Sequence, residues 1–320
     1  MLYLYGAIIM MLYRKNKLSF QRNSILYFAV QEKISWKKQF IDHPKEVKTM
    51  SKPKITTLME DTLCGTGLEA EHGLSLYIET EKHKLLADTG QTAKTWANAS
   101  AKKIDITKVD TVFLSHGHYD HSGGLLTFAS ANPSADIYMH ENAGGEYYSF
   151  KEGGERYIGI DKSILTLPNL HLINGNTVID EELSVFTNVS PKRNWPKGNK
   201  RLHQLKNSEY VQDTFSHEIY LVIRYDQDKY ILISGCAHNG ILNILDSFRN
   251  IYGTDPSIVV SGFHMVQPEY TEDDLQKIKE TAVELSKMDT VFYSGHCTGE
   301  TAYQLLKEIM GEKLKAIRDL

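Results

Sequence analysis

Four apolar segments of this chain run directly into glycine and into side chains that bind metals. The segments are LLADTG, VFLSHGHYDH, YILISGCAH and VFYSGHCTG, beginning at residues 85, 112, 230 and 291. Their β-branched, aromatic and aliphatic residues favour buried strands. Loops at the carboxyl ends of strands are where layered α/β enzymes gather their chemistry. These four segments therefore predict an α/β fold with a polar site built from strand ends.

The order of the remaining segments predicts a four-layer αββα sandwich, because strands and helices alternate in two halves around a variable middle. Predicted strands cover 55–60, 74–80, 84–88, 111–115, 135–140, 219–225, 229–235, 258–263 and 290–295. Predicted helices cover 92–102, 123–130, 241–252, 272–287 and 300–313. The middle, 142–216, is rich in Gly, Asn, Lys and Pro and is expected to form loops over a site. A final strand after the last helix is expected to be missing or very short.

The strongest chemical signal is the stretch SHGHYDHSGG at residues 115–124. Imidazole and carboxylate groups are ligands for Zn²⁺ and also serve Mn²⁺ or Fe²⁺. Four such groups in one turn would repel one another or stay unsatisfied without a cation, and the neighbouring glycines permit a tight path. The stretch therefore predicts a site for one or two divalent transition-metal ions, Zn²⁺ foremost, whose donors include His116, His118, Asp120 and His121.

This HxHxDH motif after a buried strand resembles the metallo-β-lactamase superfamily, and the resemblance extends through most of residues 54–313. It implies the metallo-β-lactamase fold. It also implies that Asp88, at the end of an early strand, orients metal ligands without binding the metal.

Five segments narrow the resemblance to the dihydropteroate-synthase-like subfamily. They are AEHGLSLYIET, LLADTGQT, SHGHYDHSGGL, ISGCAHNGILNIL and SGHCTGETA. The type member of that subfamily is a methanopterin-pathway synthase that joins a dihydropterin to a ribofuranosylaminobenzene phosphate. In this subfamily Cys236 stands where other members place a bridging Asp. A structural or substrate-lining thiol is an equal alternative to a thiolate ligand at this position.

The remaining metal donors are expected from the later strands. His296 and His238 each follow a strand and a glycine, and both are predicted ligands. His217 is the alternative to His238, because the family's third His usually precedes the strand pair. At the rim, Asn239 and His264 are predicted to contact an anionic substrate, and His72 to support the site from a neighbouring loop. The other histidines, His43, His83, His140, His171 and His203, are expected at the surface or in packing.

Hydrolysis is the predicted reaction, because a bound dication lowers the pKa of its water from 15.7 to about 7 and supplies a metal-bound hydroxide near neutral pH. In this scheme one ion is held by His116, His118 and His238, and the other by Asp120, His121 and His296, with Asp120 also orienting the attacking water. The alternative is transfer of a dihydropterin from its pyrophosphate to an arylamine ribofuranosyl phosphate. A non-catalytic ligand sensor is a third hypothesis, which loss of a motif residue would have favoured; none is lost.

Charge and cysteine content limit the partners. Of the 36 Lys and Arg residues nine precede Met50, and of the 40 Asp and Glu residues three do, so the remainder holds 27 basic against 37 acidic residues. An acidic body argues against nucleic-acid binding. The three separated cysteines fit a reducing, cytoplasmic setting. A small-molecule substrate is expected, and a homo-oligomer is compatible with the sequence.

The first 49 residues differ from the rest. The apolar run 2–13 is shorter than the roughly 20 residues that cross a bilayer, and basic residues follow it instead of preceding it as in a secretory signal. Residues 1–49 are therefore predicted to be an N-terminal appendage, or sequence upstream of a mis-assigned start with Met50 as the natural one. Residues 50–320 are predicted to form the catalytic domain.

Overall fold

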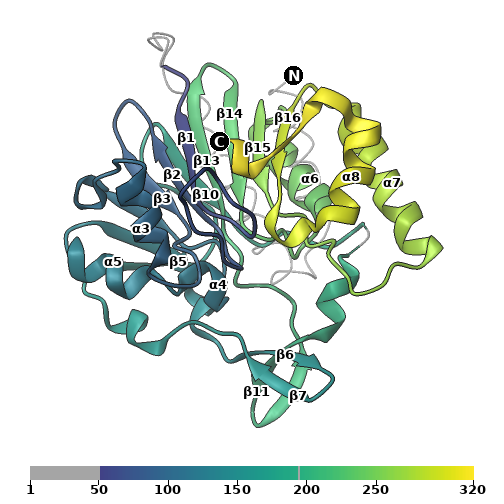
Figure 1. The fold of residues 1–320 in the computed structure, drawn as a ribbon, viewed down its shortest axis with the longest axis horizontal. Helices are drawn as coiled ribbons and strands as arrows, with labels where there is room; N and C mark the ends of the chain where they lie inside the picture. Colours follow the sequence, from purple (N-terminus) through teal and green to yellow (C-terminus); the bar gives the residue numbers. More distant parts are fainter. Residues whose placement is uncertain (1–50, 194) are drawn as a thin grey trace, which may run out of the picture. The chain divides into compact units, whose positions relative to one another are not determined.

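The computed structural model describes residues 51–193 and 195–320, and the predicted appendage over 1–49 lies outside them. Two sheets stack face to face, with helices on both outer sides (Figure 1). Their apolar inner faces must be buried against each other, and this gives the predicted four-layer sandwich.

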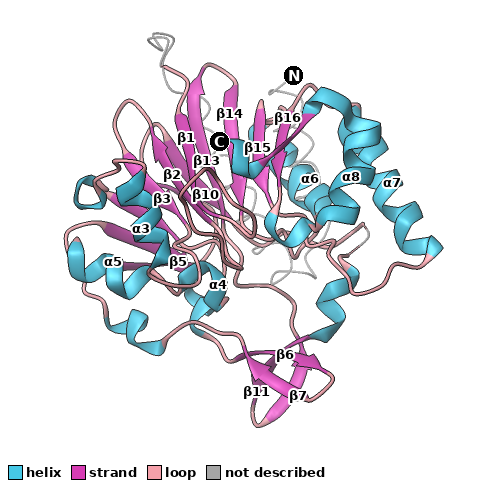
Figure 2. Cartoon of the chain, in the orientation of Figure 1, coloured by secondary structure: helices cyan, strands magenta, loops and turns pink. Residues whose placement is uncertain are grey.

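The first sheet has the strand order β1-β2-β3-β4-β5-β8. Strands β1 to β3 pair antiparallel, whereas β3, β4, β5 and β8 run parallel. Their bounds are Lys54–Met59, Ser75–Glu79, Lys84–Ala87, Thr111–Phe113, Asp136–His140 and Leu170–Ile173. Helices α3 (Lys94–Ala101) and α5 (Leu125–Ala131) cover its outer face (Figure 2). The four-residue α4 (Tyr119–Ser122) follows β4 at the ends of the strands.

The second sheet has the order β17-β16-β15-β14-β13-β10-β9. Its strands in chain order span Thr177–Val178 (β9), Leu183–Phe186 (β10), Tyr220–Asp226 (β13), Lys229–Ser234 (β14), Ile258–Ser261 (β15), Val291–Ser294 (β16) and Leu314–Ala316 (β17). Helices α6 (Ile241–Tyr252), α7 (Glu272–Ser286) and α8 (Glu300–Met310) cover its outer side. The final strand is present and three residues long, pairing parallel with β16.

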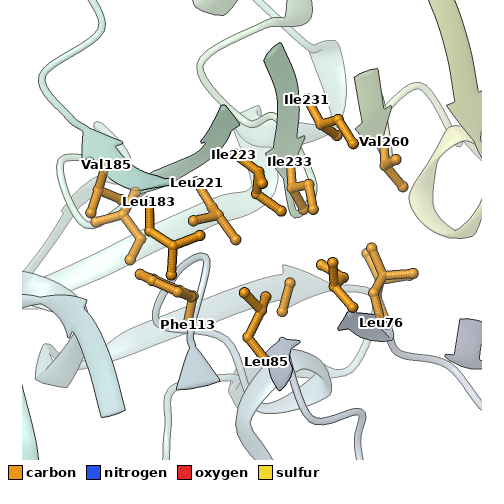
Figure 3. Close-up of a cluster of buried hydrophobic side chains, with 14 of the residues drawn as sticks. Leu76, Leu85, Phe113, Leu183, Val185, Leu221, Ile223, Ile231, Ile233 and Val260 are labelled. Carbon is orange, nitrogen blue, oxygen red and sulfur yellow. The ribbon is translucent and has the colours of Figure 1, made fainter. Parts of the chain in front are cut away.

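The core lies between the sheets, where side chains such as Leu85 and Phe113 meet Leu221 and Ile233 (Figure 3). All four are at most 4% exposed. Burying each such side chain contributes about 1.5–3 kcal/mol, so this interface fixes the relative position of the two sheets. Because the site is built from strand ends of both sheets, the same interface fixes the site.

The prediction of loops over 142–216 is wrong in part. This region contributes β8, β9 and β10 to the main sheets, and it also forms a third, antiparallel sheet, order β12-β11-β6-β7. The strands of this inserted sheet span Tyr147–Lys151 (β6), Gly154–Tyr157 (β7), Leu202–Lys206 (β11) and Glu209–Gln212 (β12). Every residue of β7 and β12 is exposed, so neither strand shows the alternation of apolar and polar residues that marks a half-buried strand.

In the described ranges, with 1–50 and 194 left aside, no helix is both long and apolar enough to cross a bilayer. Cys64, Cys236 and Cys297 are free and buried.

Candidate metal centre

The HxHxDH turn runs from the end of β4 into α4, which contains Asp120 and His121. The chain folds tightly there because Gly117, Gly123 and Gly124 let neighbouring backbones approach. A Cβ at position 123 would lie 1.9 Å from the backbone oxygen of Gln91, and one at position 117 would lie 2.4 Å from that of Ala143. All four predicted donors of this turn are buried, with exposures of 0–7%. The turn therefore directs imidazole and carboxylate groups inward, as the spacing predicts.

His116, His118 and His238 form one group of rings, although His238 follows β14 in the other sheet. The ring centroids are 4.5 Å apart for His116 and His118, 5.0 Å for His116 and His238, and 4.9 Å for His118 and His238. The Nε2 atom of each ring is buried and has no hydrogen-bond partner among the described residues. Burial, and to a smaller extent the neighbouring imidazoles, lower the pKa of all three rings; together these effects bring the pKa of His118 to about 3. The three rings are therefore neutral, with free lone pairs.

A second group lies beside the first and contains Asp120, His121, Cys236 and His296, whose donor atoms lie within 4.8 Å of one another. The Oδ2 atom of Asp120 is 3.5 Å from Nε2 of both His121 and His296. Burial opposes protonation of these two rings, but their carboxylate neighbours raise the pKa of both. The thiol of Cys236 also belongs to a group with His116 and His238, so it lies between the two sets of donors.

Hydrogen bonds at the Nδ1 atoms orient the rings. Nδ1 of His121 lies 2.6 Å from Oδ2 of Asp88, and Nδ1 of His116 lies 2.8 Å from Oγ of Ser115, whose hydroxyl donates to the same carboxylate. Both Nδ1 atoms must therefore donate, which leaves each Nε2 atom as the acceptor. Nε2 of His116 has no partner among the described residues, and Nε2 of His121 faces Sγ of Cys236 at 3.2 Å. Asp88 thus orients the ring of His121 directly and that of His116 through Ser115, from a left-handed φ of 61°.

His238 and His296 are held in the same tautomer by residues that sequence reasoning missed. Nδ1 of His238 lies 3.0 Å from Oδ1 of Asn199, whose amide nitrogen donates to the His238 carbonyl. Nδ1 of His296 lies 2.5 Å from Oδ1 of Asp61, and its backbone N–H donates to Glu60. Glu60 and Asp61 directly follow β1, so they obey the strand-end pattern that identified the other donors. That pattern was the signal that could have found them.

His217 has the opposite arrangement. Its Nδ1 accepts a hydrogen bond from the Gly117 backbone at 3.0 Å, so Nε2 carries the proton and donates to Oδ2 of Asp213 at 3.0 Å. With both nitrogens engaged, His217 supports the HxHxDH turn and has no free lone pair. Asp213 is a further residue that sequence reasoning missed.

The predicted rim residues differ in position. His264 is 7% exposed, and neither of its ring nitrogens has a partner among the described residues. It lines the cavity that reaches Asp120 and His238. Asn239 does not line that cavity; its amide donates to the Phe215 carbonyl, Glu218 and Tyr220. Asn239 therefore belongs to the buried network in which Glu218 accepts from the backbone of His238, and its contact with a substrate stays a prediction.

His72 lies where it was expected, beside the second group. Its Nδ1 is 3.0 Å from Oδ2 of Asp61 and its Nε2 is 3.4 Å from Oδ2 of Asp120. Its side chain is 52% exposed, so it lies at the mouth of the site. The His83 and His140 side chains lie away from both groups: His83 pairs with Asp110 and Asp180, and Nδ1 of His140 accepts from the backbone of Asn142.

Comparison with known proteins agrees with this geometry. The family model of the metallo-beta-lactamase superfamily matches residues 68–292. The chain belongs to the metallo-beta-lactamase superfamily. Buried His, Asp and Cys donors fit this metal-dependent family.

Individual relatives of this superfamily member cover most of the chain. The crystal structure of Tm1679, a metal-dependent hydrolase of the beta-lactamase superfamily, is 28% identical, covers 84% of this chain and 96% of its own, and has a TM-score of 0.70. The 7,8-dihydropterin-6-methyl-4-(beta-D-ribofuranosyl)-aminobenzene-5'-phosphate synthase of Methanocaldococcus jannaschii is 28% identical over 82% of this chain and 94% of its own length. An uncharacterized protein of the same organism, MJ0448, is 28% identical over 75% and 89%.

Proposed function

We propose that this protein is a hydrolase that uses two divalent transition-metal ions, zinc foremost, on a small anionic substrate. The observation that carries the proposal is the set of buried, unpartnered Nε2 atoms of His116, His118, His238 and His296. Leaving a buried polar atom without a partner costs about 1–3 kcal/mol, so four neighbouring cases require an explanation. Cations bound by their lone pairs supply it.

The hydrogen bonds suggest how the donors divide. In this assignment His116, His118 and His238 hold one ion, because their rings form one group with free Nε2 atoms. Asp120, His121 and His296 hold the other, and the thiol of Cys236 lies between the two sets. His217 is not a ligand, since both of its nitrogens are engaged.

A divalent ion held there would lower the pKa of a coordinated water to about 7 and polarise an oxygen of the substrate. The chain's own groups do the rest. Oδ2 of Asp120 faces His72, His121 and His296, so this carboxylate is placed to accept a proton from the attacking water and hold it in line. Asp61 and Asp88 keep the imidazole rings in the ligating tautomer throughout.

The experiment is metal analysis of three alanine variants of buried histidines. Wild-type protein is expected to bind two ions per chain by elemental mass spectrometry, and His118→Ala and His238→Ala to lose one or both ions together with phosphodiesterase or esterase activity. His217→Ala is the matched control, because this ring contacts the same cluster and is expected to keep both ions. Full metal occupancy in His238→Ala, or loss of metal only in His217→Ala, would contradict the assignment.

Group transfer is the second candidate, and two observations favour it. The synthase of Methanocaldococcus jannaschii is similar along nearly its whole length. A second cavity of about 250 Å³, lined by Trp195, Ile241 and Met265, meets the first at His264 and offers space for a second reactant. Incubation with a dihydropterin pyrophosphate separates the candidates: pyrophosphate release only when an arylamine is present indicates transfer, and release in water alone indicates hydrolysis.

A further inference from the structure

The inserted sheet forms the wall of the cavity opposite the metal-type donors. The cavity has a volume of about 340 Å³ and is lined on one side by His118, Asp120 and Cys236. On the other side it is lined by residues of β6, β7 and the start of β11. The core strands thus supply the donors, and the inserted sheet supplies the surface that meets the remainder of a substrate.

Three basic side chains line the cavity. Lys151 belongs to β6, Arg156 to β7, and Arg201 directly precedes β11. None of them has a carboxylate partner in the described part of the chain, where the surface Lys and Arg residues of other elements form many ion pairs. Arg156 is paired across the sheet with Ser149, and Ser149 is paired on its other side with Leu202, directly after Arg201. This register brings the two arginines to either side of β6.

The surroundings of the arginines are those of a binding group. The Arg156 guanidinium lies 4.9 Å above the ring of Tyr119, which holds it over the cavity. The Nε atom of Arg201 is buried and has no hydrogen-bond partner among the described residues. An unpaired buried donor of this kind is costly unless a ligand satisfies it.

We propose that Arg156 and Arg201 form a clamp for a phosphate group that the substrate carries away from the bond that is broken. The clamp rests on the proposed function only in that both use the same cavity. Guanidinium groups bind phosphate oxygens in bidentate fashion, and two of them match the charge of a phosphate dianion better than that of a carboxylate. Glu152 and Glu155 also line the cavity and, like Arg156, are exposed. Glu152 lies in the turn between β6 and β7, and alternation along β7 directs the side chains of Glu155 and Arg156 to opposite faces of the sheet.

The test measures binding of phenylphosphonate, a probe that cannot be hydrolysed, to the zinc-loaded full chain by isothermal titration calorimetry. Arg156→Ala/Arg201→Ala is expected to raise the dissociation constant at least tenfold, and Arg156→Lys/Arg201→Lys to recover part of the loss. Lys206→Ala is the matched control, because this exposed lysine lies at the far end of β11 and does not line the cavity. It is expected to bind as wild type does.

Zinc content and thermal unfolding are measured for each variant, which separates the clamp from the metal site. A double variant that is folded, retains zinc and binds the probe within twofold of wild type places the probe on the metal cluster alone and overturns the clamp. Benzoate binding as tightly as phenylphosphonate, with the same dependence on the arginines, overturns the assignment to phosphate. If the wild-type chain takes up no zinc but its binding of the probe still depends on the arginines, the proposed function is contradicted and the clamp is supported.

Discussion

Replacement of Asp61 tests whether the carboxylates that contact the Nδ1 atoms of the histidine rings select the tautomer whose Nε2 can bind a metal. Oδ1 of Asp61 lies 2.5 Å from Nδ1 of His296 and 3.2 Å from the Gly73 backbone nitrogen, and Oδ2 lies 3.0 Å from Nδ1 of His72. Burial opposes ionisation, but the two histidines lower the pKa of this carboxyl, so it is ionised at neutral pH. In Asp61→Asn the amide oxygen is expected to keep its place beside Nδ1 of His296. In the flipped orientation the amide NH₂ group would instead face two donors, this Nδ1–H and the Gly73 backbone N–H. The variant therefore exchanges a charged acceptor for a neutral one.

Loss of the hydrogen-bond partner of a ligating histidine costs about 10-fold to 100-fold in metal affinity, or about 1.4–2.7 kcal/mol. We expect Asp61→Asn near the lower value and Asp61→Ala, which leaves no acceptor, near the upper one. Only the ion next to His296 should be affected, since His116 and its group are oriented by other residues. Competition with a chromophoric zinc chelator resolves the two binding constants, and Asp273→Asn on the exposed face of α7 is the control. Equal weakening of both ions, or none, would refute the tautomer argument.

Three further predictions concern stability and the glycines. Asp110 and Asp180 raise the pKa of His83 to about 10, so the charged form stabilises the fold fully below the unfolded pKa near 6.5 and less as pH rises to 10. Urea unfolding should show His83→Ala less stable by about 1–2 kcal/mol at pH 6 and by less at pH 10, since surface screening reduces such pairs. Leu85→Ala should cost about 2–5 kcal/mol in the same assay without changing zinc content. Gly123→Ala should cost about 1–3 kcal/mol by overpacking and should lower zinc content, and unchanged zinc would contradict the role assigned to that close approach.

The core and the HxHxDH turn were predictable because both are encoded locally. Strands such as β14 are buried along most of their length and stand out as apolar runs, and the four donors of the turn lie within six residues of one another. The order of these runs along the chain was sufficient to predict two sheets between helices. Helix α6 was predicted with the bounds that the structure gives, 241–252.

The sequence alone could not decide whether His217 or His238 is the third histidine ligand, because the order of segments along the chain allows either. It depends on contacts between distant segments: Asn199 reaches His238 from 39 residues away, and Gly117 reaches His217 from 100. The inserted sheet was missed for a different reason. Its outer strands bury neither face, so their sequences lack the period-2 pattern, and pairing across the sheet is what forms them.

Five of the ten non-glycine residues with left-handed φ angles in the described part of the chain lie around the donors, and two, Asn207 and Ser208, lie in the turn between β11 and β12 of the inserted sheet. Asp88, Phe215, Ala237, His264 and His296 all adopt left-handed φ angles of 48–61° without being glycine. Each such residue costs about 1–3 kcal/mol and persists only where surrounding packing determines it. The donor loops therefore depend on the rigid interface between the two main sheets, whereas the arginines of the inserted sheet can change without disturbing it. On the proposed clamp, substitutions in β6, β7 and the start of β11 are expected to change substrate preference and to preserve the metal-type cluster.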